Sequence, residues 1–184
     1  MTGEPSSVRS VRFPAAYGTP GGPDSLRPWS DIEERVRAAS NYWITTVGPD
    51  ARPHARPVDG VWVGGALCFG GSPETRWVRN LMANPSVSVH LSSEAEAIIL
   101  EGTAEYVTDP SHPLAALSTA ASKEKYPQYF SGQASPFRPF WALRPTTAYA
   151  WTLEGFPRGA TRWRFSTGYH PAGNVLPRRS GHAD

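Results

Sequence analysis

Two groups of residues in this sequence are suited to holding a phosphate. Arg56 lies in an extended stretch, and Ser72, Thr75 and Arg76 stand at the start of a predicted helix. The first turn of a helix offers free backbone N–H groups and a positive dipole end, which bind anions. An arginine from a second element would add a charge-assisted hydrogen bond to the same anion. The pattern predicts a phosphate site, with the alternative that Arg76 and Arg79 only form a solvated helix face.

The residues beside these arginines could contact the rest of a ligand. Period-two alternation places His54 and Val58 on the face of Arg56, and Pro57 on the other face. His54 either touches a substrate or a ring system, or is an ordinary strand histidine. Trp77 is either a stacking platform or part of the core, and its place in an apolar stripe at helical spacing favours the core.

Several other kinds of site are excluded. The sequence contains none of the motifs G-x-x-x-x-G-K-[ST], G-x-G-x-x-G and G-x-S-x-G. Its five histidines are too dispersed to indicate a metal site, and the single cysteine, Cys68, excludes an intrachain disulfide. We expect Cys68 to be a small buried hydrophobic residue. The net charge of +2 without a basic stripe argues against nucleic-acid binding. No residue stands out as a general acid or base.

The sequence also bears on location. No apolar run approaches the roughly 20 residues needed to cross a bilayer, so no membrane association is expected. The N-terminus lacks the apolar core of a signal peptide, because arginines interrupt residues 8–13. A cytoplasmic location is therefore expected.

The elements that would position the phosphate site are mainly strands. About six strands joined mostly by turns predict a mainly β fold, a six-stranded antiparallel barrel with short flanking helices. Residues 52–63 are expected to form one strand, with Pro53 and Pro57 at an edge or bulge. Gly64–Gly65 is expected to turn the chain, and Gly102 to mark a bulge.

Three regions are expected along the chain. Residues 1–29 are predicted to be an irregular arm, rich in Pro and Gly, that lies over the surface through Phe13 and Tyr17. Residues 30–165 form the barrel domain, whose first helix starts with a capping box of Ser30 and Glu33. Residues 166–184 are predicted to be a disordered tail.

The order and spacing of several segments carry a resemblance to a known family. These segments are YWITTV, RPHARPV, ALCF, TRWVRNLMANP and ILEGTAEYV, with a weaker echo in Arg162–Phe165. The chain resembles the pyridoxamine 5'-phosphate oxidase-like, FMN-binding split-barrel proteins. Within them it is most similar to the branch that includes flavin- or deazaflavin (F420)-dependent reductases.

The resemblance implies a site and its occupant. Arg56 and the pair Thr75–Arg76 match residues that contact the cofactor phosphate, and the strand around Val58 lies along the ring system. Trp77 stands where the family usually has a phosphate-binding lysine. Trp163 would either cover a cofactor from a neighbouring subunit or close the barrel.

The resemblance also implies a function. It implies a homodimer that binds FMN, or alternatively F420, and transfers hydride between that cofactor and a small organic substrate. The alternative is a non-catalytic protein that carries flavin, haem or another planar ligand on the same barrel. A third possibility is a structural dimer without a cofactor.

Overall fold

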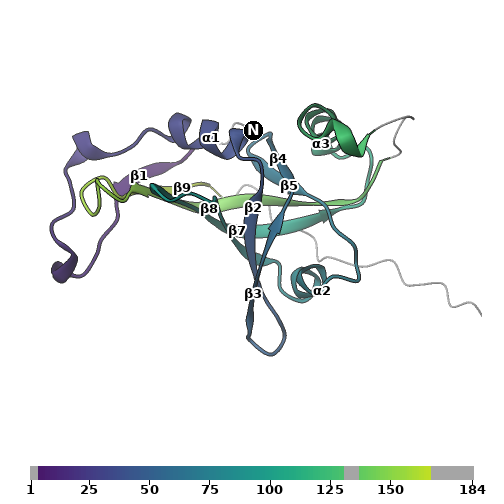
Figure 1. The fold of residues 1–184 in the computed structure, drawn as a ribbon, viewed down its shortest axis with the longest axis horizontal. Coiled ribbons are helices and arrows are strands. Elements are labelled where there is room, and N and C mark those ends of the chain that lie inside the picture. The colour runs from purple at the N-terminus through teal and green to yellow at the C-terminus, as the bar shows by residue number, and fades with distance from the viewer. Residues whose placement is uncertain (1–3, 131–136, 167–184) are drawn as a thin grey trace, which may run out of the picture.

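The protein is built on one antiparallel sheet of nine strands. A computed structural model describes residues 4–130 and 137–166 (Figure 1). The strands run in the spatial order β1-β9-β8-β7-β6-β2-β3, and β4 and β5 branch from this path through a pairing of β5 with β8. Their bounds are β1 (Ser7–Ser10), β2 (Tyr42–Val47), β3 (Pro53–Val58), β4 (Gly60–Val63), β5 (Ala66–Phe69), β6 (Ser86–His90), β7 (Glu96–Val107), β8 (Phe140–Thr152) and β9 (Thr161–Arg164).

The sheet branches along β8. One side of this strand pairs with β7 along nearly its whole length. On its other side, residues 141–143 pair with β5 and residues 147–150 pair with β9. The predicted mainly β, antiparallel split-barrel class is confirmed, although the strand count of six was wrong.

The expected single strand at 52–63 is one source of the difference, because Asp59 divides it into β3 and β4. β3 pairs with β2, whereas β4 pairs with β5. The Gly60 N–H donates to the Tyr126 hydroxyl (3.0 Å), and the Gly60 carbonyl accepts from Lys125 Nζ (2.9 Å). These bonds hold the backbone at the point where it leaves one strand pair for the other.

The N-terminal segment supplies another strand. Within the predicted irregular arm, β1 pairs antiparallel with β9, and two short 3₁₀ helices follow it at Ala15–Tyr17 and Pro23–Ser25. The Phe13 and Tyr17 rings pack on Phe156, with centroids 4.8 and 6.1 Å away. The predicted disordered tail lies, from residue 167 onward, outside the described residues.

Within the described residues, three α-helices flank the sheet: α1 (Trp29–Ala38), α2 (Arg76–Ala83) and α3 (Pro113–Lys125). A third 3₁₀ helix, Pro127–Tyr129, follows α3. In Figure 1, α2 lies beside β3, whereas α3 lies near β4 and β5. None of the helices in the described ranges is long and apolar enough to cross a membrane.

The predicted capping box of α1 is wrong. The helix begins at Trp29, with Pro28 in the cap position and no side-chain cap. Ser30 Oγ lies 3.4 Å from the Asp31 carboxylate, and Glu33 accepts a hydrogen bond from Trp62 Nε1 (2.8 Å). Trp29 is buried in the core. The helix therefore begins one residue before Ser30, the predicted cap.

Both predicted backbone features of the sheet are confirmed. Gly64 and Gly65 have φ values of +56° and +70° between β4 and β5, which is the conformation that glycine adopts without strain. The register of β7 against β8 shifts between Glu101 and Gly102. The prolines of β3 also fit the prediction, because β3 ends the strand order and is an edge strand.

Candidate functional site

Arg56 and Arg76 both lie near enough to His54 for their charges to affect its pKa. Arg56 lies on β3, and Arg76 is the first residue of α2, which packs against β2 and β3. The pKa of His54 is lowered, first by desolvation and then by the positive charges of Arg56 and Arg76. Because this shift stabilises the neutral imidazole, His54 is uncharged at neutral pH and leaves the site with two cations.

Neither arginine is neutralised within the described residues. No ion pair involves Arg56 or Arg76, and both side chains are exposed. Arg56 donates to the carbonyl of its neighbour Ala55 (3.0 Å). Two unpaired guanidinium groups on adjacent elements form a positive region that suits a phosphate.

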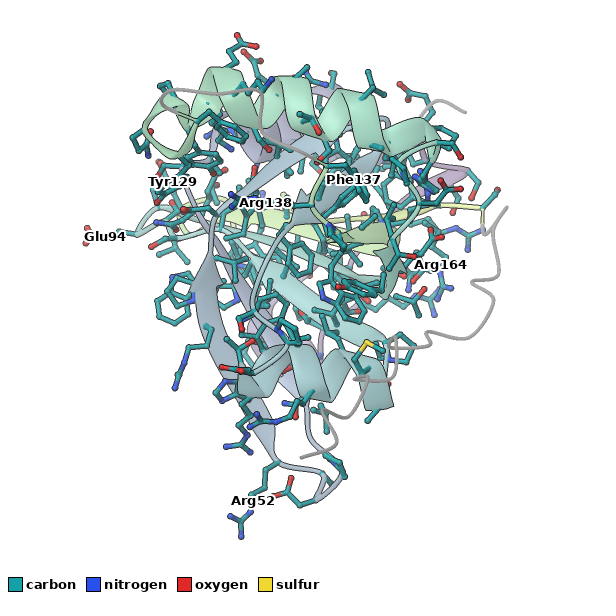
Figure 2. The ribbon with its side chains drawn as sticks, turned by 90° about the vertical axis from the view of Figure 1, so that its right-hand side faces the viewer. Arg52, Glu94, Tyr129, Phe137, Arg138 and Arg164 are labelled. Atoms are coloured by element: carbon teal, nitrogen blue, oxygen red, sulfur yellow. The ribbon has the colours of Figure 1, made fainter. Side chains whose placement is uncertain are left out.

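Arg79 and Arg52 make other contacts at the surface. Arg79 is exposed and donates to the Glu74 carbonyl (2.6 Å) on the surface of α2, as predicted for a solvated face. Arg52 lies at the tip of the β2–β3 hairpin, where it points away from the body of the protein (Figure 2). Arg52 pairs there with Asp50 at 3.5 Å.

The predicted helix start at Ser72 is wrong by several residues. α2 begins at Arg76, with Thr75 in the cap position and no side-chain cap. Ser72 instead stabilises a preceding turn, since its Oγ accepts from the Glu74 N–H (3.2 Å) and its carbonyl accepts from Thr75 Oγ1 (2.8 Å). The free N–H groups of the first helical turn therefore begin at Arg76, beside the Thr75 hydroxyl.

A buried hydrogen-bond chain fixes α2 against the arginine strand. Asn80 is only 3% exposed, and its Nδ2 donates to Thr46 Oγ1 on β2 (3.0 Å). The Thr46 hydroxyl in turn lies 3.4 Å from the His54 carbonyl on β3. Asn80 is not among the predicted site residues, although an amide within the apolar stripe of a helix is a signal for a buried polar contact.

The hydrogen bond between Asn80 and Thr46 can be tested by mutation. We expect Asn80→Ala to lower the free energy of unfolding by about 1–3 kcal/mol, because it leaves the Thr46 hydroxyl buried without its donor. A double-mutant cycle with Thr46→Val, measured by urea denaturation, should show a coupling of about 0.5–3 kcal/mol. Additive effects of the two substitutions would contradict the contact.

Trp77 belongs to the core, as its spacing favoured. It is 6% exposed, and its ring centroid lies 5.7 Å from that of Phe69. A Cβ added to Gly71 would lie 2.0 Å from Trp77 Cζ2, so the indole occupies the space beside this glycine. The side chain at this position therefore supplies packing and no charge.

The two adjacent glycines provide a matched pair. We expect Gly71→Ala to destabilise the fold by about 1–3 kcal/mol, because the methyl group forces the Trp77 ring to move. Gly70→Ala should have a small effect, since nothing lies within 4 Å of an added Cβ at that position. Thermal unfolding of the two variants measures the difference, and equal losses would contradict the packing of Trp77.

The chain matches one protein-family model. A family model described as pyridoxamine 5'-phosphate oxidase matches residues 29–152, which includes every element of the Arg56–Arg76 site. The chain belongs to this family. No curated protein matches the chain significantly.

Solved structures of similar fold come from several bacteria. The haem storage protein HutZ of Vibrio cholerae is 22% identical, with a TM-score of 0.52 over 63% of this chain and 88% of that one. A conserved hypothetical protein of Mycobacterium tuberculosis is 19% identical, with a TM-score of 0.58 over 73% and 90%. A haem binding protein of Mycobacterium smegmatis is 22% identical, with a TM-score of 0.54 over 68% and 55%. At these identities the likeness shows the shared fold.

Three further predicted positions differ from one another in their exposure. On β3, Val58 is 9% exposed and joins the core, whereas Pro57 is exposed and lies opposite Trp43. Trp163 has no exposed surface, and its ring lies 5.7 Å from that of Trp29. Of the two roles considered for Trp163, this burial favours closing the barrel over covering a ligand.

Cys68 is confirmed as a buried hydrophobic residue. It is 2% exposed, and burial raises the pKa of its thiol to about 12. The thiol is therefore protonated at neutral pH and unsuited to act as a nucleophile.

Proposed function

We propose that the protein binds a flavin-type cofactor, FMN or alternatively F420, by its phosphate, and that it transfers hydride between this cofactor and a small organic substrate. The observation that carries the proposal is the pair of guanidinium groups, Arg56 and Arg76, which lack a carboxylate partner in the described residues and flank the start of α2. Membership of the family supports it.

Different residues of this chain would bind the phosphate and the ring of the cofactor. Arg56 and Arg76 would hold the phosphate from two elements, with the Thr75 hydroxyl and the first N–H groups of α2 beside them. His54 would meet the ring or the substrate as a neutral imidazole. A bound flavin or deazaflavin would supply the redox chemistry, while the protein supplies position and charge.

We further propose that the outer face of the sheet pairs with a second copy of the chain. Cross-strand register aligns Trp43, His90 and Ile99 in one row on this face. The row is only half-buried at Trp43, whose ring stacks on His90 with centroids 6.2 Å apart. Partly exposed aromatic and aliphatic side chains in one row suit a protein interface.

Absorption spectroscopy tests cofactor binding. We expect the purified protein to carry a yellow chromophore or to take up FMN or F420, with a shift in the cofactor spectrum. Absence of binding of either compound at high micromolar concentration would contradict the proposal. A panel of reductants and acceptors then distinguishes an oxidoreductase, which cycles the bound cofactor, from a carrier, which does not.

A haem-type carrier is the second candidate. Two points favour it: position 77 carries a buried tryptophan and no cation, and the lowered pKa of His54 leaves a neutral imidazole of the kind that ligates iron. HutZ and the Mycobacterium smegmatis protein, which share the fold, are haem proteins by name. Titration with haemin distinguishes the candidates, because a carrier would give a haem spectrum that His54→Ala alters.

A further inference from the structure

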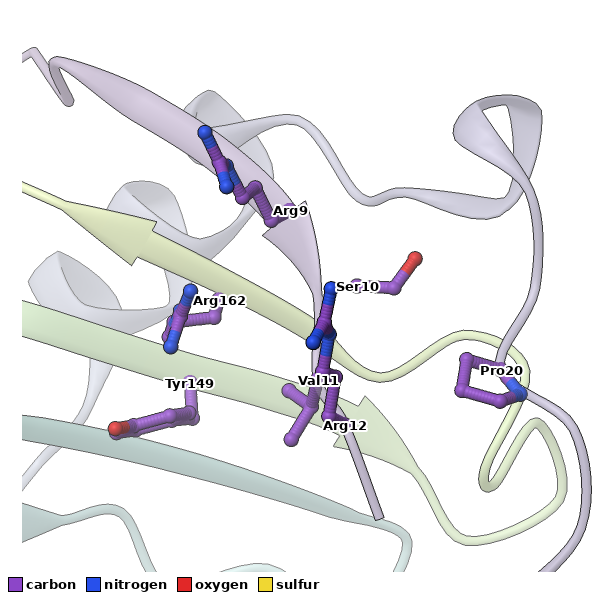
Figure 3. Close-up of a pocket in the computed structure, with 7 residues that line it drawn as sticks. All are labelled: Arg9, Ser10, Val11, Arg12, Pro20, Tyr149 and Arg162. Atoms are coloured by element: carbon purple, nitrogen blue, oxygen red, sulfur yellow. The ribbon is translucent and has the colours of Figure 1, made fainter. Parts of the chain in front are cut away.

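A second group of arginines lies at the opposite end of the strand order from β3. Arg9 on β1 is the direct cross-strand partner of Arg162 on β9, and Arg162 is the partner of Tyr149 on β8. Direct partners point to the same face of an antiparallel sheet. With Arg12, these residues line a groove of about 730 Å³ (Figure 3). Figure 3 shows Arg162 above Tyr149, with Arg9 and Arg12 coming from the N-terminal segment.

The positive charge of this groove is not balanced within it. None of the residues that line the groove is acidic. In the described part of the chain, no ion pair involves Arg9, Arg12 or Arg162. Glu96 bridges Arg27 (3.1 Å) and Arg35 (2.6 Å) instead. Like charges directly opposite each other destabilise a strand pair, so the arrangement gains stability from an anion.

Hydrogen bonds hold the walls of the groove in place. Ser10 Oγ donates to the Gly21 carbonyl (2.9 Å), which ties the segment around Pro20 to β1. The Gly21 N–H donates to the Arg158 carbonyl (3.1 Å), and the Val11 N–H donates to the Ala160 carbonyl (2.9 Å). The arginines are therefore carried by a backbone fixed on both sides, which favours a specific contact over diffuse attraction.

We propose that this groove binds a small compound with at least two anionic groups, an oligophosphate or a polycarboxylate. A single negative charge would leave most of the charge of three guanidinium groups uncompensated. A polyanion can instead form a charge-assisted hydrogen bond with each guanidinium group. The Tyr149 hydroxyl adds a polar group at the floor of the groove. The site is separate from the Arg56–Arg76 pair, because β1 and β3 lie at opposite ends of the strand order (Figure 1).

The test uses the full chain with its other phosphate site removed. In the Arg56→Gln/Arg76→Gln background, isothermal titration with pyrophosphate and with citrate should give one binding event. Addition of Arg9→Gln or Arg162→Gln should weaken that event by about 10-fold or more, the value of a hydrogen bond to a charged group. Arg52→Gln, an exposed arginine at the hairpin tip, is the matched control and should leave the affinity unchanged.

A second measurement distinguishes loss of the anion site from loss of the fold. Without added anion and at low salt, Arg162→Gln should raise the melting temperature, because it removes a like-charge pair, and added pyrophosphate should stabilise the parent more than this variant. Unchanged titrations in the Arg9 and Arg162 variants would overturn the proposal. It would also be overturned if Arg162→Gln weakened self-association and left anion binding intact, since the arginines would then serve a contact between copies of the chain.

Discussion

Replacing Arg56 and Arg76 together with glutamine should weaken FMN binding by about 100-fold or more. A hydrogen bond between charged groups contributes about 1.5–3 kcal/mol, and the two guanidinium groups lie on different elements around His54. Glutamine keeps the aliphatic stem and a polar end, so the loss should come from the missing guanidinium charge and its hydrogen-bond donors. Quenching of flavin fluorescence on titration measures the affinity.

Matched variants distinguish a phosphate contact from a change in net charge. Arg79→Gln removes one charge from the same helix at a side chain that is exposed and bonded to the Glu74 carbonyl. We expect its effect on FMN affinity to be less than about threefold, since exposed charges at a distance are screened by salt. If Arg79→Gln weakened binding as much as either single variant of Arg56 or Arg76, the assigned phosphate site would be wrong.

Trp163→Ala should be among the strongly destabilising substitutions in the barrel. The side chain has no exposed surface and packs against Trp29 at the point where β9 meets α1. Truncating a buried tryptophan costs about 3–5 kcal/mol, because contacts are lost and a cavity remains. Chemical denaturation of the variant and the parent measures this loss.

Phenylalanine substitutions refine this prediction. Trp163 Nε1 has no hydrogen-bond partner in the described residues, so Trp163→Phe should retain much of the stability. Trp62→Phe loses a hydrogen bond to Glu33 (2.8 Å) as well as ring volume, and should be more costly. A Trp163→Ala variant that folded with parental stability but lost its ligand would instead support the role of covering a cofactor.

The sequence predicted the fold class from features that are local. Alternation in residues 86–90, the glycine pair at 64–65 and the bulge at Gly102 each depend on a few neighbouring residues. The strand break at Asp59 depends instead on Tyr126 and Lys125, which lie more than sixty residues away. No local pattern could reveal it. The start of α1 was missed for a related reason, since the burial of Trp29 depends on contacts with Trp62 and Trp163.

The candidate site was predictable where it rests on charge and less so where it rests on packing. Arg56 and Arg76 were chosen by type and spacing, and both are exposed and contribute to the lowered pKa of His54. Trp77 was assigned to the core by its helical stripe, but the space that Gly71 provides for it requires coordinates. Asn80 escaped notice because its partner, Thr46, lies on a strand far away in sequence.

Comparison of FMN with riboflavin tests the central claim most directly. The two ligands share the ring system and differ in the phosphate, so their affinity ratio isolates the contribution of Arg56, Thr75 and Arg76. We expect the parent to bind FMN at least about 100-fold more tightly than riboflavin, and the Arg56→Gln/Arg76→Gln variant to lose most of this ratio. Equal affinity of the parent for the two ligands would contradict a phosphate-anchored cofactor at this site.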